Sequence, residues 1–287
     1  MKRIRTATEY DVKWLEIDRP QPLIDKKIDN LIKDAIDGKI PVDPSDLVYE
    51  NFKKEMEEYI ISSTLNNLKQ IKDWGRKDIC IGCTHFIDSI YMRTSPQILR
   101  GDYRYHERLN PNIIYSQPKN LVRNTPLIIA MPFPSTGDVH YQMNEILDEC
   151  IEKNIEVHID GAWITCCRDI DFDFSHPAIE SIAISLSKGL GLGWNRIGLR
   201  WSKRNVSDAI SIMNDFNMNL RALANIGLYF LRNIPIDHLW LTHRNNYYKI
   251  CKDFNLTPSK SIYIALRDGQ PIGLSPLLRY LELYGDL

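Results

Sequence analysis

The side chains with the most evident chemistry lie in the segment 185–198, where a lysine stands among serines and glycines. Lys188 follows Ser185 and Ser187, and Arg196 comes eight positions after the lysine. A lysine amine can form a Schiff base with an aldehyde, and hydroxyls with a guanidinium can bind a phosphate dianion. A lone lysine between serines is more often a solvated loop residue, so other segments of the chain must decide between the two interpretations.

Three further segments carry polar or small residues soon after short apolar runs. They are Asp160–Trp163, Gly82–Thr84 and Pro134–Gly137. A parallel sheet gathers its ligands at the carboxyl ends of its strands, and Asp160 stands at such an end. Asp160 by itself could equally cap a helix, so its interpretation depends on Lys188 and Arg196.

Together these segments resemble the class I/II aminotransferases, the fold-type I enzymes that depend on pyridoxal 5′-phosphate (PLP). Residues 185–198 resemble the family's lysine segment, and Asp160–Trp163 is similar to its Asp-x-Ala-Tyr. Pro134–Gly137 looks like its Asn-Pro-Thr-Gly loop, and Gly82–Thr84 like its phosphate turn. The resemblance covers about residues 79–201 in the family's order, in a chain shorter than ordinary members.

The resemblance implies two catalytic residues. Lys188 would hold the PLP aldehyde as an internal aldimine, and Asp160 would face the pyridine nitrogen, so that the ring stays protonated and acts as an electron sink. Arg196 and Thr84 would bind the phosphate with backbone N–H groups of the turn at Gly82. The residues expected to contact the cofactor are Gly82, Cys83, Thr84, Tyr105, Asp160, Ala162, Trp163, Ser185, Ser187, Lys188 and Arg196.

The sequence also departs from the family pattern. Trp163 replaces the family's tyrosine, and its indole N–H can donate a hydrogen bond but offers no hydroxyl. Pro134 stands where an asparagine bonds the ring oxygen, and proline has no donor. Tyr103, Tyr105 and His106 lie where the family keeps a ring over the cofactor. We choose Tyr105, although a core or surface aromatic residue is an equal alternative.

The elements that must position these residues follow from the apolar pattern. Short apolar runs alternate with helical stretches, and an amphipathic helix is expected at 143–151. The runs span residues 79–81, 127–131, 155–159, 182–184 and 197–199. This alternation predicts an α/β fold with a mainly parallel sheet flanked by helices, as in fold-type I transferases.

Helical spacing predicts further helices on both sides of this central region. Expected helices cover about residues 24–35, 48–59, 210–226, 238–254 and 276–283, and a strand covers 262–266. Gly38 ends the first helix, and Ser45 or Asp46 can cap the second. We therefore expect a PLP-binding α/β domain at 56–204. The N-terminal helical segment 1–55 and the C-terminal part 205–287 would build a small second lobe.

Composition excludes several classes of function. Among 287 residues, 36 Lys and Arg balance 37 Asp and Glu, which predicts no nucleic-acid partner and no membrane partner. The basic stretch Met1–Ala7 has no apolar core after it and is no signal peptide, so we expect a cytoplasmic protein. Cys80 and Cys83 lack the second ligand pair of a zinc site, which favours reduced, partly buried thiols.

Three functions fit these observations. The first is an aminotransferase that acts on a small-molecule amine or amino acid and, as the resemblance implies, forms a homodimer. The second is a PLP-dependent lyase or decarboxylase on the same fold, because the abbreviated C-terminal segment leaves only Arg267 or Arg279 to clamp a substrate carboxylate. The third is a non-catalytic PLP-fold binding protein. The intact set of Lys188, Asp160 and Arg196 argues against the third.

Overall fold

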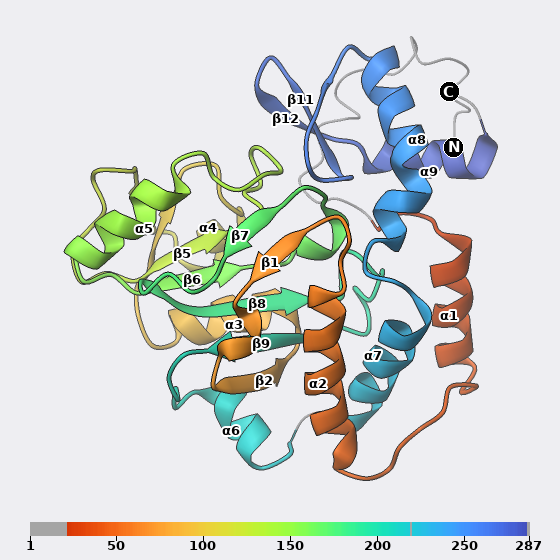
Figure 1. The fold of residues 1–287 in the computed structure, drawn as a ribbon, viewed down its shortest axis with the longest axis horizontal. Coiled ribbons are helices and arrows are strands. Elements are labelled where there is room, and N and C mark those ends of the chain that lie inside the picture. The colour runs from red at the N-terminus through yellow and green to blue at the C-terminus, as the bar shows by residue number, and fades with distance from the viewer. Residues whose placement is uncertain (1–21, 219, 286–287) are drawn as a thin grey trace.

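A seven-stranded sheet runs through the centre of the molecule (Figure 1). The computed structural model describes residues 22–218 and 220–285, so the stretch Met1–Ala7 lies outside the described residues. In spatial order the strands are β2 (Arg76–Cys80), β9 (Gly198–Ser202), β8 (Ile179–Ser185), β6 (Val157–Asp160), β5 (Leu127–Ala130), β3 (Gln97–Leu99) and β4 (Ile114–Ser116). Strand β9 runs antiparallel to both its neighbours, and the other pairs are parallel.

The central strands are apolar because both faces of the sheet are covered. Every residue of β5, β6, β8 and β9 is buried. Successive residues serve opposite faces: Leu127 and Ile129 belong to one core cluster, and Ile128 belongs to the other. Near-continuous apolar strands of this kind are typical of sheets with helices on both sides, which confirms the predicted fold class.

Helices cover the sheet on its two faces. One face carries α3 (Gly82–Tyr91) and α6 (Ala209–Asp215). The amphipathic helix α5 (Met143–Glu152) buries Met143, Ile146, Leu147 and Cys150 of its predicted apolar stripe, whereas Ile151 is exposed. Helices α2 (Leu47–Ile61) and α7 (Arg221–Asn233) pack side by side (Figure 1). Their approach is close, because a Cβ at Gly227 would lie 2.6 Å from a ring carbon of Phe52.

The remaining elements lie outside the central sheet and the helices that cover it. A second group contains α1 (Lys26–Ile36), α8 (His238–Asp253), α9 (Ser275–Tyr284) and the sheet of β10 (Thr257–Pro258), β11 (Ile264–Arg267) and β12 (Gln270–Gly273). Strand β1 (Asn67–Lys69) pairs in parallel with β7 (Asp171–Asp173). Helix α4 (Tyr105–Leu109) and 3-10 turns at Ile71–Asp73 and Ile164–Cys166 complete the described chain.

Most predicted elements are present, with some revisions. Asp46 stands at the N-cap of α2, as predicted, but its side chain makes no capping hydrogen bond there. The apolar stripe expected as one helix over 210–226 is divided into α6 and α7 by a break after Asp215. The expected boundary between residues 55 and 56 falls inside α2, which packs on both β2 and α7. The division into a central domain and a small lobe stays a prediction.

Asp25 joins the N-terminal helix α1 to the C-terminal helix α8. One carboxylate oxygen accepts hydrogen bonds from the main-chain N–H groups of Lys27 and Ile28 at 3.0 Å each, which caps α1. The other accepts from Nε2 of His238 at 2.9 Å and of His243 at 3.2 Å. Burial raises the pKa of Asp25, but the bonds from the two histidines and from Ile28 outweigh it and hold the pKa well below its usual range.

We expect Asp25→Ala to lower the free energy of unfolding by about 3 kcal/mol at pH 7, because it removes a helix cap and a buried hydrogen-bonded carboxylate. A carboxyl with a lowered pKa stabilises the fold above its unfolded pKa of about 4, and this contribution is lost as the pH falls further. Denaturant titrations should therefore show that the difference in unfolding free energy between wild type and Asp25→Ala is smaller at pH 3 than at pH 7.

Asp37→Ala is the matched control, since Asp37 is exposed and forms its ion pair with the neighbouring, exposed Lys39. The free energy of unfolding of this variant should stay within about 0.5 kcal/mol of the wild-type value at either pH. Equal losses of unfolding free energy in the two variants would contradict the stabilising role of Asp25 between α1 and α8.

Candidate active site

The predicted site residues meet at one edge of the central sheet. Asp160 ends β6, Ser185 ends β8, and Gly82 follows the end of β2. These three strands run in the same direction, because β2 and β8 are both antiparallel to β9 and β6 is parallel to β8. Lys188 and Arg196 lie in the connection from β8 to β9, which begins and ends at this same edge.

The turn at Gly82 and the guanidinium of Arg196 form a compact polar corner. Gly82 has φ +71° and opens α3, and a Cβ there would lie 3.1 Å from Nη2 of Arg196. That same nitrogen donates to Oγ1 of Thr84 at 2.6 Å. A helix N-terminus with a guanidinium and a hydroxyl is an arrangement that binds phosphate groups. The sequence therefore placed these three residues correctly beside one another.

Asp160 is buried, with 4% of its surface exposed. It accepts a hydrogen bond from the Ala162 N–H at 3.0 Å and another from the Cys83 thiol. Burial raises the pKa of Asp160, although these bonds and the charges of Lys188 and Arg196 act in the opposite direction. A buried carboxyl whose pKa is raised is stabilised as an anion by a further positive group, which a protonated ring nitrogen can supply.

Cys83 and Ser185 connect Asp160 to the neighbouring strands. The Cys83 sulfur lies 3.3 Å from the Ala183 carbonyl oxygen, so its single proton is shared between that oxygen and the Asp160 carboxylate, and the Ser185 side chain also bonds the thiol. Burial raises the pKa of Cys83 well above its usual value, so the group stays a thiol and a donor. Cys83 thus contacts Asp160 directly, and Ser185 is connected to Asp160 through Cys83.

Lys188 is held from several sides. Its Nζ lies 5.8 Å from the ring centroid of Trp163, and its main-chain carbonyl accepts a hydrogen bond from the Tyr263 hydroxyl at 3.1 Å. The following residue, Gly189, is pressed against Thr165. Beside the lysine, the Ser187 hydroxyl oxygen is buried and has no hydrogen-bond partner among the described residues.

The tyrosines predicted to lie near the cofactor are stacked on each other, and His106 meets the Tyr103 ring edge to face. The Tyr103 and Tyr105 rings lie 5.8 Å apart, and the Tyr105 hydroxyl donates to Asp88 at 2.8 Å. Burial, followed by the bond to Asp88, raises the pKa of Tyr105 to about 12. His106 is buried against Tyr91 at 3.2 Å. The choice of Tyr105 over Tyr103 stays a prediction.

Arg267 and Arg279 both bind main-chain carbonyls. Arg267 donates to the Phe254 carbonyl at 3.4 Å, and Arg279 donates to the Pro22 carbonyl. Arg279 also acts electrostatically on Tyr263. These contacts select neither arginine as a substrate clamp.

Three residues that sequence analysis did not identify lie against the candidate site, namely Asp102, Thr165 and Tyr263. Asp102 accepts from the N–H groups of Tyr103 at 2.6 Å and Ala130 at 3.1 Å, and Ala130 is the register partner of Asp160. Burial raises the pKa of Asp102 to about 7. No local pattern marks these residues, since each reaches the site from another segment of the chain.

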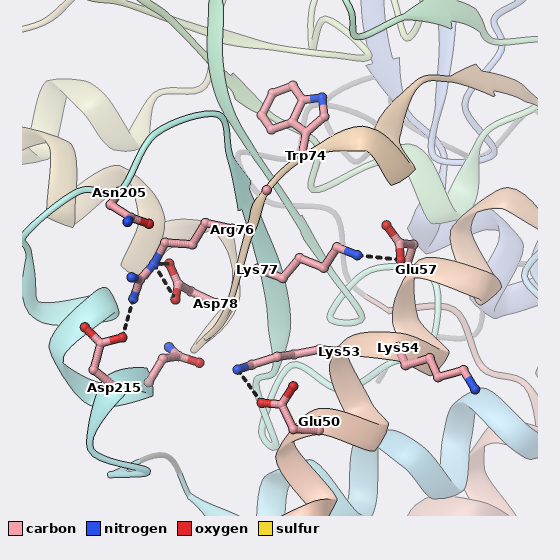
Figure 2. A pocket seen from close by; sticks show the side chains of 12 residues that line it. Glu50, Lys53, Lys54, Glu57, Trp74, Arg76, Lys77, Asp78, Asn205 and Asp215 are labelled. Atoms are coloured by element: carbon pink, nitrogen blue, oxygen red, sulfur yellow. Dashed lines mark hydrogen bonds and ion pairs between the residues drawn. The ribbon is translucent and has the colours of Figure 1, made fainter.

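A cavity of about 500 Å³ lies at the opposite edge of the sheet, next to the beginning of β2 (Figure 2). Its basic groups are paired with acids: Arg76 with Asp78 and Asp215 at 2.9 and 2.8 Å, and Lys77 with Glu57 at 2.7 Å. A second cavity of similar size is lined by His140 and residues of α5 and β7, among others. The cavity at β2 is thus separate from the edge that holds Lys188.

Comparison with known proteins identifies the fold. The chain matches the structure of an aromatic aminotransferase from Pyrococcus horikoshii OT3 over 88% of its own length and 78% of that protein, with a TM-score of 0.61 and 14% identity. It matches an alanine aminotransferase from Pyrococcus furiosus over 89% and 74%, with a TM-score of 0.60 and 12% identity. The chain has the fold of the fold-type I PLP enzymes.

Other fold-type I structures carry a different activity. A PLP-bound C-S lyase from Staphylococcus hominis matches over 91% of this chain and 77% of its own, with a TM-score of 0.56 and 12% identity. No protein-family model and no curated protein matches the sequence. None of the described helices is long and apolar enough to cross a membrane.

The segment that carries Lys188 depends on a close approach at Gly189. A Cβ there would lie 2.4 Å from Oγ1 and 2.6 Å from the carbonyl oxygen of Thr165, so Gly189→Ala must displace one of them. We expect this variant to lower the free energy of unfolding by about 2 kcal/mol in a denaturant titration. Gly193→Ala, in the same connection with open space around its Cβ, should stay within about 0.5 kcal/mol. Equal effects would contradict the assigned packing.

Proposed function

We propose that this protein is a PLP-dependent aminotransferase in which Lys188 carries the cofactor. The observation that supports this most strongly is the meeting of Lys188, Asp160 and Arg196 at one edge of the sheet, in a fold whose solved examples include aminotransferases. The substrates would be small-molecule amines or amino acids.

The residues present fit this cofactor. The corner of Arg196, Thr84 and Gly82 matches a phosphate dianion, and the unpartnered Ser187 hydroxyl can donate to the same region. Asp160 is a buried acid that accepts hydrogen bonds yet has a raised pKa, which suits a partner that carries a proton on a ring nitrogen.

Each residue then has a definite task. When bound, PLP supplies an aldehyde for an amine and an electron sink for the charge that develops at the substrate α-carbon. The Lys188 Nζ would hold the cofactor aldehyde and, as a free amine, would take up and return the proton of the substrate α-carbon. The Asp160 carboxylate keeps the proton on the pyridine nitrogen, and Arg196 and Thr84 hold the phosphate in place.

We also propose that the protein is a cytoplasmic homodimer, as the resemblance to fold-type I enzymes implies. Sedimentation equilibrium tests the oligomeric state. A species at twice the chain mass of 33.4 kDa is expected. A monomer at micromolar concentration would contradict the dimer. The proposed reaction has a separate test, which does not depend on this result.

The test of the reaction mixes the PLP-loaded protein with a panel of amines and amino acids and follows conversion to pyridoxamine phosphate. Conversion by one member of the panel, reversed by a keto acid or aldehyde, is the expected result. Release of carbon dioxide or of a cleaved product without pyridoxamine phosphate would favour a lyase or decarboxylase. Bound PLP with no spectral change across the panel would favour a non-catalytic binding protein.

A further inference from the structure

Tyr263 lies behind the lysine segment although it is 75 residues away in the sequence. It is fully buried, just before β11, and its own main chain is anchored by the Leu274 N–H, which donates to the Tyr263 carbonyl at 2.8 Å. Its hydroxyl donates to the Lys188 carbonyl at 3.1 Å and accepts from the Leu23 N–H at 3.4 Å. One phenol therefore links the lysine, the C-terminal lobe and the segment that leads into α1.

The ring of the same tyrosine supports the other contact of the lysine. Tyr263 meets Trp163 edge to face, with centroids 5.6 Å apart and an interplanar angle of 81°. The Lys188 Nζ lies 5.8 Å from the Trp163 centroid. The lysine main chain is thus held by the Tyr263 hydroxyl, and the ring beside its ammonium is held by the Tyr263 ring.

We propose that Tyr263 is a positioning residue for Lys188, acting through the Lys188 carbonyl and through Trp163, a role that rests on the proposed function of the lysine. Its two contacts fix both ends of the lysine, the main chain and the ring that faces the amine. The hydroxyl also makes the position of Lys188 depend on the segment at Leu23. Burial raises the pKa of Tyr263, so the hydroxyl keeps its proton and stays a donor over the working pH range.

Loss of the Tyr263 hydroxyl should make the position of Lys188 less well defined. Without the donor, the Lys188 carbonyl is left with one hydrogen bond fewer, and the segment 186–190 can shift away from Trp163. An ammonium that leaves an aromatic face loses a cation–π contact and becomes more open to reagents. The reactivity of the amine therefore reports the role of Tyr263 in the cofactor-free protein.

The experiment measures acetylation of Lys188 by acetic anhydride in cofactor-free protein, by mass spectrometry, with the exposed Lys54 as internal reference. In Tyr263→Phe the Lys188 rate should rise about three- to tenfold, the factor that corresponds to one neutral hydrogen bond. In the PLP-loaded variant, kcat should fall about tenfold with little change in KM, because a misplaced lysine impairs proton transfer more than binding.

Tyr247→Phe is the matched control. Tyr247 is also fully buried and packs on a tryptophan, and its hydroxyl donates to the Ile264 carbonyl at 2.9 Å and accepts from the Ser259 N–H at 2.7 Å. Because Ile264 follows Tyr263, this variant reveals any effect that merely loosens β11. Its Lys188 acetylation should match that of the wild type.

The outcomes separate this proposal from the proposed function. Equal Lys188 rates in Tyr263→Phe and wild type, or equal increases in both tyrosine variants, would overturn the role of Tyr263. Failure of wild-type protein to bind PLP would overturn the proposed function. PLP binding is measured in a separate sample, so it does not affect the acetylation rates of the cofactor-free protein. If Tyr263→Phe does not fold, Trp163→Leu must raise the Lys188 rate by the same reasoning, and an unchanged rate there overturns the proposal.

Discussion

Replacement of Lys188 by alanine is expected to reduce turnover by at least about 10⁴-fold, because it removes both the amine that holds the cofactor and the group that moves the α-proton. Borohydride reduction of the wild-type protein with PLP should fix the cofactor to the peptide that contains Lys188. The same treatment of Lys188→Ala should leave the peptides unlabelled.

Lys203→Ala is a closely matched control. The Lys203 Nζ lies 5.6 Å from the ring centroid of Trp74, much as Lys188 lies over Trp163, but Lys203 follows the far end of β9. Its loss should leave turnover and labelling near the wild-type level. A label that maps to another lysine, or a reducible imine in Lys188→Ala, would remove Lys188 from its assigned role.

Asp160→Asn is expected to reduce turnover by about 10³-fold, or roughly 4 kcal/mol of transition-state stabilisation. An amide cannot keep the proton on the pyridine nitrogen, which weakens the electron sink. PLP should still bind, because Lys188, Arg196 and Thr84 are unchanged. Steady-state kinetics with the best substrate of the panel gives the measurement, and near-normal turnover would remove Asp160 from the site.

The stability of the same variant provides a second measurement with a definite sign. The folded-state pKa of Asp160 is raised, so the folded protein holds this proton more tightly than the unfolded chain does. The contribution of Asp160 to the free energy of unfolding therefore falls as the pH rises from about 4 through the folded-state pKa. At pH 7 the cofactor-free Asp160→Asn protein should be at least as stable as wild type. A large loss of stability would indicate that Asp160 serves the fold.

The sequence predicted the central fold because local patterns carry that information. The runs at 127–131 and 155–159 became β5 and β6, since fully buried parallel strands read as continuous apolar segments. Strand order and the reversed direction of β9 depend on tertiary packing and leave no local signal. The three-residue strands β3 and β4 are too short to show a period, and they were not predicted.

Candidate site residues could be predicted where one segment supplies several of them. Lys188 and Arg196 became candidates because they share a short segment, and Gly82 with Thr84 because they form a turn. The structure brings these residues together at one edge of the sheet, and their roles stay proposals. The contacts of Cys83 with Asp160 and of Tyr263 with Lys188 join residues far apart in the chain. Such pairs follow from the packed structure, and a single sequence holds no local pattern that marks them.

The reversed strand β9 has a consequence for how a cofactor would leave. Ser185 and Gly198 are register partners, so the connection 186–197 is closed by one antiparallel pair and carries both Lys188 and Arg196. Local opening of such a connection is a cooperative event. If Lys188 and Arg196 hold the cofactor as proposed, opening of this one connection would release both of its anchors together and would set the residence time of the cofactor.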